Sequence, residues 1–197
     1  MANVSDVKSK FFEPDGVDAD QVSASGSATT LVIADGGPYG NLTETITLYS
    51  TADNSGITFD ITGTDGNGDA QTETLTGPNA GTVNSANKYL TVTSIVSDGA
   101  IATDIQAGIL GTGALTGTVF AGRTRIRGLT GTSKASAGNI VFKNTSITGT
   151  TLLTIPLTGA VGNIDPYIPD NGVLFSAGAY INLTAADVTG ITVYYDG

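Results

Sequence analysis

The chain lacks histidine, cysteine and tryptophan altogether, and only 13% of its 197 residues are charged. Without histidine and cysteine it has no ligands for ordinary zinc sites and no residues for Ser-His-Asp or Cys-His catalysis. It also has no disulfide framework. No apolar run approaches the roughly 18 residues that a membrane-spanning helix needs. We therefore expect a protein that is not an enzyme, binds no cofactor or metal, and does not enter a membrane.

Basic residues are also scarce, and the net charge is −10. Phosphate binding needs clustered lysine and arginine, so this balance argues against nucleic acid and against anionic membrane surfaces as partners. The first sixteen residues contain no apolar signal-peptide core. Together with the missing cysteines, this is typical of a protein that is made in a reducing cytosol.

What the chain does have is short runs in which threonine alternates with apolar residues, separated by glycine-rich turns. The clearest is Ile57–Gly77, which predicts a strand, a turn at Asp65–Asp69 and a returning strand. Similar runs recur every 8 to 14 residues along the chain. This spacing predicts an all-β fold made of small β-sandwich or jelly-roll-like domains.

An uneven charge distribution predicts two such domains in tandem. Residues 1–122 carry 14 acidic and 3 basic groups, whereas residues 123–197 carry 4 acidic and 5 basic groups. We predict an N-terminal extended arm, an N-terminal β-domain, a Gly/Thr-rich linker and a C-terminal β-domain, with the bounds 1–25, 26–110, 111–122 and 123–197. The alternative is one continuous sandwich, in which Gly108–Gly122 is only an irregular strand and turn.

Two groups of oxygen-bearing residues could carry chemistry. Asp65, Asn67 and Asp69 have the spacing of the first half of a calcium loop, but Ala70 and Thr76 stand where that loop needs glycine and glutamate. A β-turn explains the same residues without a metal. A carboxylate pair could in principle hydrolyse glycosides, but the chain has only three glutamates, and two of them lie on or near outward strand positions.

Two other sets of residues are candidates for partner binding. Phe11 and Phe12 stand on the predicted arm, where they dock either on this chain or on a neighbour. Arg123, Arg125 and Arg127 are spaced at i, i+2 and i+4, so a strand would present all three on one face. This basic stripe is either ordinary solvated surface or a docking surface for carboxylates, including those of the acidic part of another copy.

Tyrosines offer a further possibility, a platform for carbohydrate, with Tyr39, Tyr167, Tyr180, Tyr194 and Tyr195 as candidates. Adjacent strand residues point to opposite faces, so at most one of Tyr194 and Tyr195 can serve. Aromatic packing in a small β-core explains the same residues without a ligand.

Two stretches resemble known virion proteins. The series AGRTRIRGL, SAGNIVFKN, TTLLTIPL, IPDNGVLFSAGAYINLT and ITVYYDG resembles short β-rich structural proteins of tailed bacteriophages, notably marine and cyanobacterial phages. The passage from Ile61 to Val83, followed by KYLTVTSI, resembles another module of phage virion proteins. Together these stretches cover most of residues 55–197, and the resemblance transfers no catalytic or binding residues to this chain.

This resemblance implies a non-enzymatic virion component that is assembled in the host cytoplasm. We expect a capsid decoration (cement) protein that binds and stabilises the shell, with copies of itself, the major capsid protein or other virion proteins as partners. The alternatives are a tail or fibre-base protein, a carbohydrate-binding or adhesion module, and a surface-layer repeat.

Overall fold

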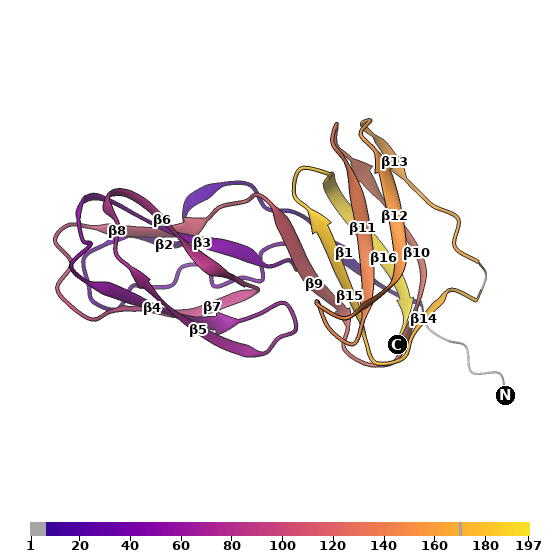
Figure 1. The fold of residues 1–197 in the computed structure, drawn as a ribbon, viewed down its shortest axis with the longest axis horizontal. Helices are drawn as coiled ribbons and strands as arrows, with labels where there is room; N and C mark the ends of the chain where they lie inside the picture. Colours follow the sequence, from indigo (N-terminus) through magenta and orange to yellow (C-terminus); the bar gives the residue numbers. More distant parts are fainter. Residues whose placement is uncertain (1–6, 170) are drawn as a thin grey trace. The chain divides into compact units, whose positions relative to one another are not determined.

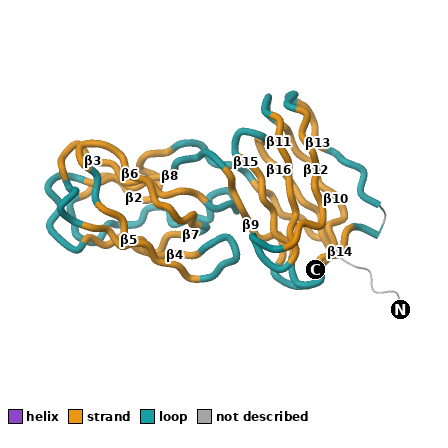
Figure 2. Tube along the Cα trace, viewed as in Figure 1, coloured by secondary structure: helices purple, strands orange, loops and turns teal. Residues whose placement is uncertain are grey.

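The computed structural model describes residues 7–169 and 171–197. In these residues there is no helix, and the paired strands of the named sheets are antiparallel. Figure 2 shows strands joined by loops and turns throughout. The prediction of an all-β protein is therefore confirmed.

The chain divides into two compact units. Unit 1 comprises the described parts of Met1–Pro14, Gly40–Leu42 and Thr112–Gly197, and unit 2 comprises Asp15–Tyr39 and Thr43–Gly111. The polypeptide therefore passes between the units four times. Unit 2 is inserted between the first strand of unit 1 and the remainder of that unit.

Unit 2 contains two antiparallel sheets (Figure 1). Four strands form the first sheet, in the order β2 (Asp18–Gly26), β8 (Ile105–Ile109), β3 (Glu44–Asp53) and β6 (Asn79–Tyr89). Three strands form the second, in the order β5 (Ala70–Thr76), β4 (Thr58–Thr64) and β7 (Thr91–Ser97).

The predicted hairpin of unit 2 is present as β4 and β5, with Thr58 opposite Thr76 and Thr64 opposite Ala70. Its period of two explains its burial, because Phe59 and Ile61 are buried while Asp60 between them is exposed. These side chains join one hydrophobic cluster to which both sheets of the unit contribute.

Unit 1 also contains two antiparallel sheets. The first runs in the order β1 (Val7–Phe12), β16 (Val188–Asp196), β10 (Thr124–Ser133) and β13 (Gly162–Ile164), and β14 (Val173–Phe175) also pairs with β10. The second runs in the order β12 (Thr150–Thr158), β11 (Ala137–Asn144), β15 (Ala179–Thr184) and β9 (Ala114–Phe120). Both sheets contribute to a single hydrophobic cluster.

The predicted N-terminal arm of residues 1–25 is divided between the two units. Residues 1–6 lie outside the described residues. Val7–Phe12 is strand β1 of unit 1 and pairs with β16, whereas Asp18–Gly26 is strand β2 of unit 2 and pairs with β8. The reason is the burial of Phe12 and Val22, each of which is fully enclosed in the core of its own unit.

The predicted linker of residues 111–122 contains strand β9 of unit 1. Leu115 and Val119 are buried, and Gly117 between them lies against the chain at Asn41. A Cβ atom at position 117 would come within 2.4 Å of the Asn41 carbonyl oxygen. Glycine in this stretch therefore permits close packing of backbone. The last passage of the chain from unit 2 to unit 1 follows Gly111.

Candidate functional site

Most of the predicted partner-binding residues lie on one sheet of unit 1. We use the name outer face for the side of the β1–β16–β10 sheet that points away from the hydrophobic cluster. Alternation along the strands directs to this face, among others, the side chains of Phe11, Arg125, Thr130, Thr132, Thr192 and Tyr194. The outer face is the candidate functional site because it gathers exposed aromatic and basic groups that are far apart in the sequence.

Phe11 and Phe12 have different roles although they are adjacent. Phe12 is 0% exposed and packs in the unit 1 core, with the Nζ atom of Lys10 5.5 Å from the centre of its ring. Phe11 remains 48% exposed on the outer face, opposite Thr192. In this structure Phe12 is thus a core residue, and only Phe11 is available to a partner.

The arginine stripe is less regular than the sequence predicts. A register shift occurs between Ile126, which pairs with Tyr195, and Gly128, which pairs with Tyr194, so that Arg127 falls in a β-bulge. A Nη1 atom of Arg127 lies 3.5 Å from a carboxylate oxygen of Asp196. The simple rule that alternate residues share a face therefore does not hold across this segment.

The three arginines nevertheless lie close together at one end of the outer face. Arg123 and Arg125 line a shallow groove with Leu174 and Asp196, the acid that pairs with Arg127. Arg125 also donates a hydrogen bond to the Asn171 carbonyl, which orients its side chain. We call this feature the arginine groove.

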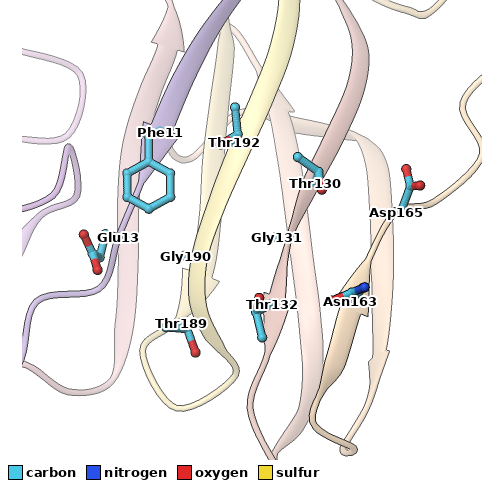
Figure 3. Close-up of a pocket in the computed structure, with 10 residues that line it drawn as sticks. All are labelled: Phe11, Glu13, Thr130, Gly131, Thr132, Asn163, Asp165, Thr189, Gly190 and Thr192. Carbon is cyan, nitrogen blue, oxygen red and sulfur yellow. The ribbon is translucent and has the colours of Figure 1, made fainter.

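A second groove lies at the other end of the outer face, beside Phe11 (Figure 3). We call it the Phe11 groove. It has a volume of about 460 Å³, and it is lined by Phe11, Glu13, Thr130, Gly131, Thr132, Asn163, Asp165, Thr189, Gly190 and Thr192. In the described part of the chain, the side chains of Glu13, Asn163 and Asp165 make no hydrogen bond or ion pair within the protein.

The tyrosines do not gather into one platform. Tyr194 is exposed on the outer face, whereas Tyr195 packs against the core and lies 5.8 Å from the ring of Phe120. Tyr39 and Tyr180 are buried, and Tyr167 is exposed on a loop. The expectation that only one of the adjacent pair faces outward agrees with the geometry.

The Asp65–Asp69 segment forms the predicted turn. The Asp65 carboxylate accepts hydrogen bonds from the backbone N–H groups of Asn67 and Asp69 and from the side-chain amide of Asn67. The Asp69 carbonyl accepts a further hydrogen bond from the Asp65 N–H group. Among the described residues, no group of three or more carboxylate, histidine or cysteine side chains is arranged to hold a metal ion.

Glu44 is the residue whose environment the sequence did not reveal. Strand β3 is buried on both sides from Glu44 to Leu48, and Glu44 itself is 0% exposed. Neither of its carboxylate oxygens accepts a hydrogen bond of normal geometry, although the backbone N–H groups of Gly111 and Thr45 lie near enough to favour the charged form. Burial raises the pKa of Glu44 to about 7, although the positive charge of Lys88 acts in the opposite direction.

The two units differ in charge. Unit 1 has seven basic and six acidic residues, a net charge of +1, whereas unit 2 has one basic and twelve acidic residues, a net charge of −11. In the residues that the structure describes, no helix is long and apolar enough to span a membrane. Neither a protein-family model nor a curated protein matches the chain.

Proposed function

We propose that the chain is a non-enzymatic structural protein of a tailed-bacteriophage virion, and within that class a capsid decoration protein. The observation that carries this proposal is the arginine groove. It exposes guanidinium groups beside an apolar side chain, Leu174, on the surface of a rigid sheet. Arginine binds carboxylates in a bidentate manner, so this end of unit 1 suits an acidic protein surface.

The proposed mechanism is adhesive. Arg123 and Arg125 bind carboxylates of the major capsid protein, or of another copy of this chain, while the sheet beside them adds contact area. An interface of about 800 Å² on each partner is enough for stable binding, and symmetric repetition on a shell adds avidity. The units then act as two β-sandwich or jelly-roll-like modules, a proposal supported by the two sheets that share one core in each unit.

Three other functions remain as rivals. A tail or fibre-base protein has the same chemistry at another position on the particle. A carbohydrate-binding or adhesion module is favoured by the Phe11 groove, which has an exposed ring among polar groups. A surface-layer repeat is the third rival.

Immunogold electron microscopy of particles from cells that produce the protein tests the virion assignment. Labelling spread evenly over the heads supports capsid decoration, whereas labelling of the tail supports the first rival. If no particle carries the label, the virion proposal is overturned.

A binding assay on undecorated capsids tests the arginine groove itself. We expect the variant R123E/R125E/R127E to lose binding by more than about tenfold, because three charges are reversed at the contact. Lys143→Glu is the matched control on the other sheet of unit 1, and it should bind normally. Normal decoration by the triple variant, with an unchanged melting temperature, would show that the stripe is plain surface.

A further inference from the structure

The Phe11 ring lies flat on the sheet and is open to solvent. It packs over Gly190 of β16, where an added Cβ atom would lie 2.7 Å from the ring atom Cζ. Because residue 190 is glycine, the Phe11 ring can lie directly against the backbone of β16. Figure 3 shows the broad side of the ring turned outward from the strands. An aromatic side chain held in this way offers one free apolar face to a flat ligand.

Hydrogen-bonding groups surround this ring on the same surface. Threonine hydroxyls come from β10 and β16, the Asn163 amide comes from β13, and the carboxylates of Glu13 and Asp165 follow β1 and β13. The amide and both carboxylates make no hydrogen bond within the described protein, so their capacity is free for a ligand.

The charge of the groove limits the kind of ligand. Its lining contains two carboxylates and no basic side chain. Phosphate, sulfate and other anions are therefore repelled, whereas hydroxyl and amine donors find acceptors. A ligand that presents an apolar ring face and many hydroxyl donors is a saccharide.

We propose that the Phe11 groove binds a neutral or amine-bearing oligosaccharide, with one sugar ring stacked on Phe11 and the hydroxyls of another of its rings bonded to Asn163 and Asp165. Glu13 and Asp165 lie on opposite sides of the groove, with β16 and β10 between them (Figure 3). Three strand spacings separate their strands, about 14 Å. This span suits an oligosaccharide and also argues against a single cationic side chain, since the two carboxylates do not converge. The inference is independent of the virion assignment.

Nuclear magnetic resonance titration of the full chain tests this inference. The probes are the trimers of glucose, N-acetylglucosamine and glucosamine, with a heparin fragment as the anionic counterpart and pentalysine as the peptide counterpart. We expect at least one neutral or amine-bearing trimer to bind with a dissociation constant near ~1 mM. The shifted amide signals should be those of Phe11, Gly131, Gly190 and Thr192, and the heparin fragment should shift none of them.

Variants test whether the saccharide binds at the Phe11 groove. Phe11→Ala should weaken binding about tenfold, whereas Phe11→Tyr, which keeps the ring, should bind as the original does. Tyr49→Ala removes a partly exposed aromatic side chain from unit 2 and is the matched control. The inference is overturned if no trimer shifts these signals at about 10 mM, if Phe11→Ala binds normally, or if only pentalysine binds.

Discussion

Unit 1 and unit 2 are built from similar sheets but differ in charge and in how the chain assembles them. Unit 1 is nearly neutral, joins three separated segments, and carries its exposed aromatic and basic groups on one face. Unit 2 has a net charge of −11 and encloses a fully buried carboxylate, that of Glu44. The candidate binding groups thus lie in one unit and the larger electrostatic cost in the other, so each can be tested by itself.

The largest effect is expected from Phe12→Ala. Removing this fully buried ring from the core of unit 1 should lower the free energy of unfolding by about 3–5 kcal/mol. Hydrogen exchange measured by mass spectrometry should show lost protection in β9 and β16 and normal protection in unit 2. Phe59→Ala is the reciprocal control in unit 2, and Phe11→Ala should change stability by less than about 1 kcal/mol. If either core variant lowered the hydrogen-exchange protection of both units equally, the two units would unfold together.

Glu44→Gln should stabilise unit 2 in a pH-dependent manner. The folded protein holds the Glu44 proton up to a pKa of about 7, whereas the unfolded chain releases it near the ordinary value of 4.5. Stability therefore falls as the pH rises from about 4.5 to about 7, and the loss is complete above that range. At pH 8 the neutral variant should be more stable by up to about 3 kcal/mol, and at pH 4 the two proteins should be alike.

Thermal melting at pH 4, 6 and 8 measures this difference. Glu13→Gln removes one exposed charge from unit 1 and is the control. A stability gain from Glu44→Gln that is the same at pH 4 and pH 8 would contradict the buried-carboxylate explanation.

Asp65→Ala should cost unit 2 about 1–2 kcal/mol, because three N–H groups of the turn lose their acceptor. Asp65→Asn retains one acceptor oxygen and should lose less. Since the turn itself uses the carboxylate, about 1 mM calcium should leave the melting temperature unchanged. A calcium-dependent rise that Asp65→Ala abolishes would instead support a metal site.

The smallest effect is expected from salt. Unit 2 has twelve acidic residues and one basic residue, so its carboxylates repel one another, and raising the ionic strength screens this repulsion. Hydrogen exchange should report a gain of about 1 kcal/mol or less in unit 2 and a smaller change in unit 1. A larger gain in stability in unit 1 than in unit 2 would contradict this expectation.

The sequence predicts the local features of this fold well. Phe59, Asp60 and Ile61 alternate with a period of two before a turn that favours positive φ, so the hairpin follows from short-range chemistry. The burial of Phe12 in a strand is harder to predict, because VKSKFF has no clear apolar alternation and its partner strand, β16, is far away in the sequence. A pairing that distant leaves no signal in the local pattern.

The candidate site is predictable only in part, because its geometry also depends on strands that are far apart in the sequence. The sequence shows three closely spaced arginines, but the bulge at Arg127 depends on the register with β16. It shows Phe11, but the groove beside it needs residues from β10, β13 and β16. Glu44 was missed because burial on both sides of β3 is a tertiary property, and an alternating strand pattern does not report it.

The pairing of β1 with β16 also sets the order in which the protein is completed during synthesis. Phe12 leaves the ribosome long before Ile191, the residue with which it pairs. At elongation rates of about 5–20 residues per second the delay is roughly 10–40 s. Unit 2 has all its strands once Ile109 has emerged, so it can fold while β1 still waits. During that interval Phe12 is an exposed apolar residue on an unpaired strand, and the first strand of unit 1 is the part of the nascent chain most in need of protection from aggregation.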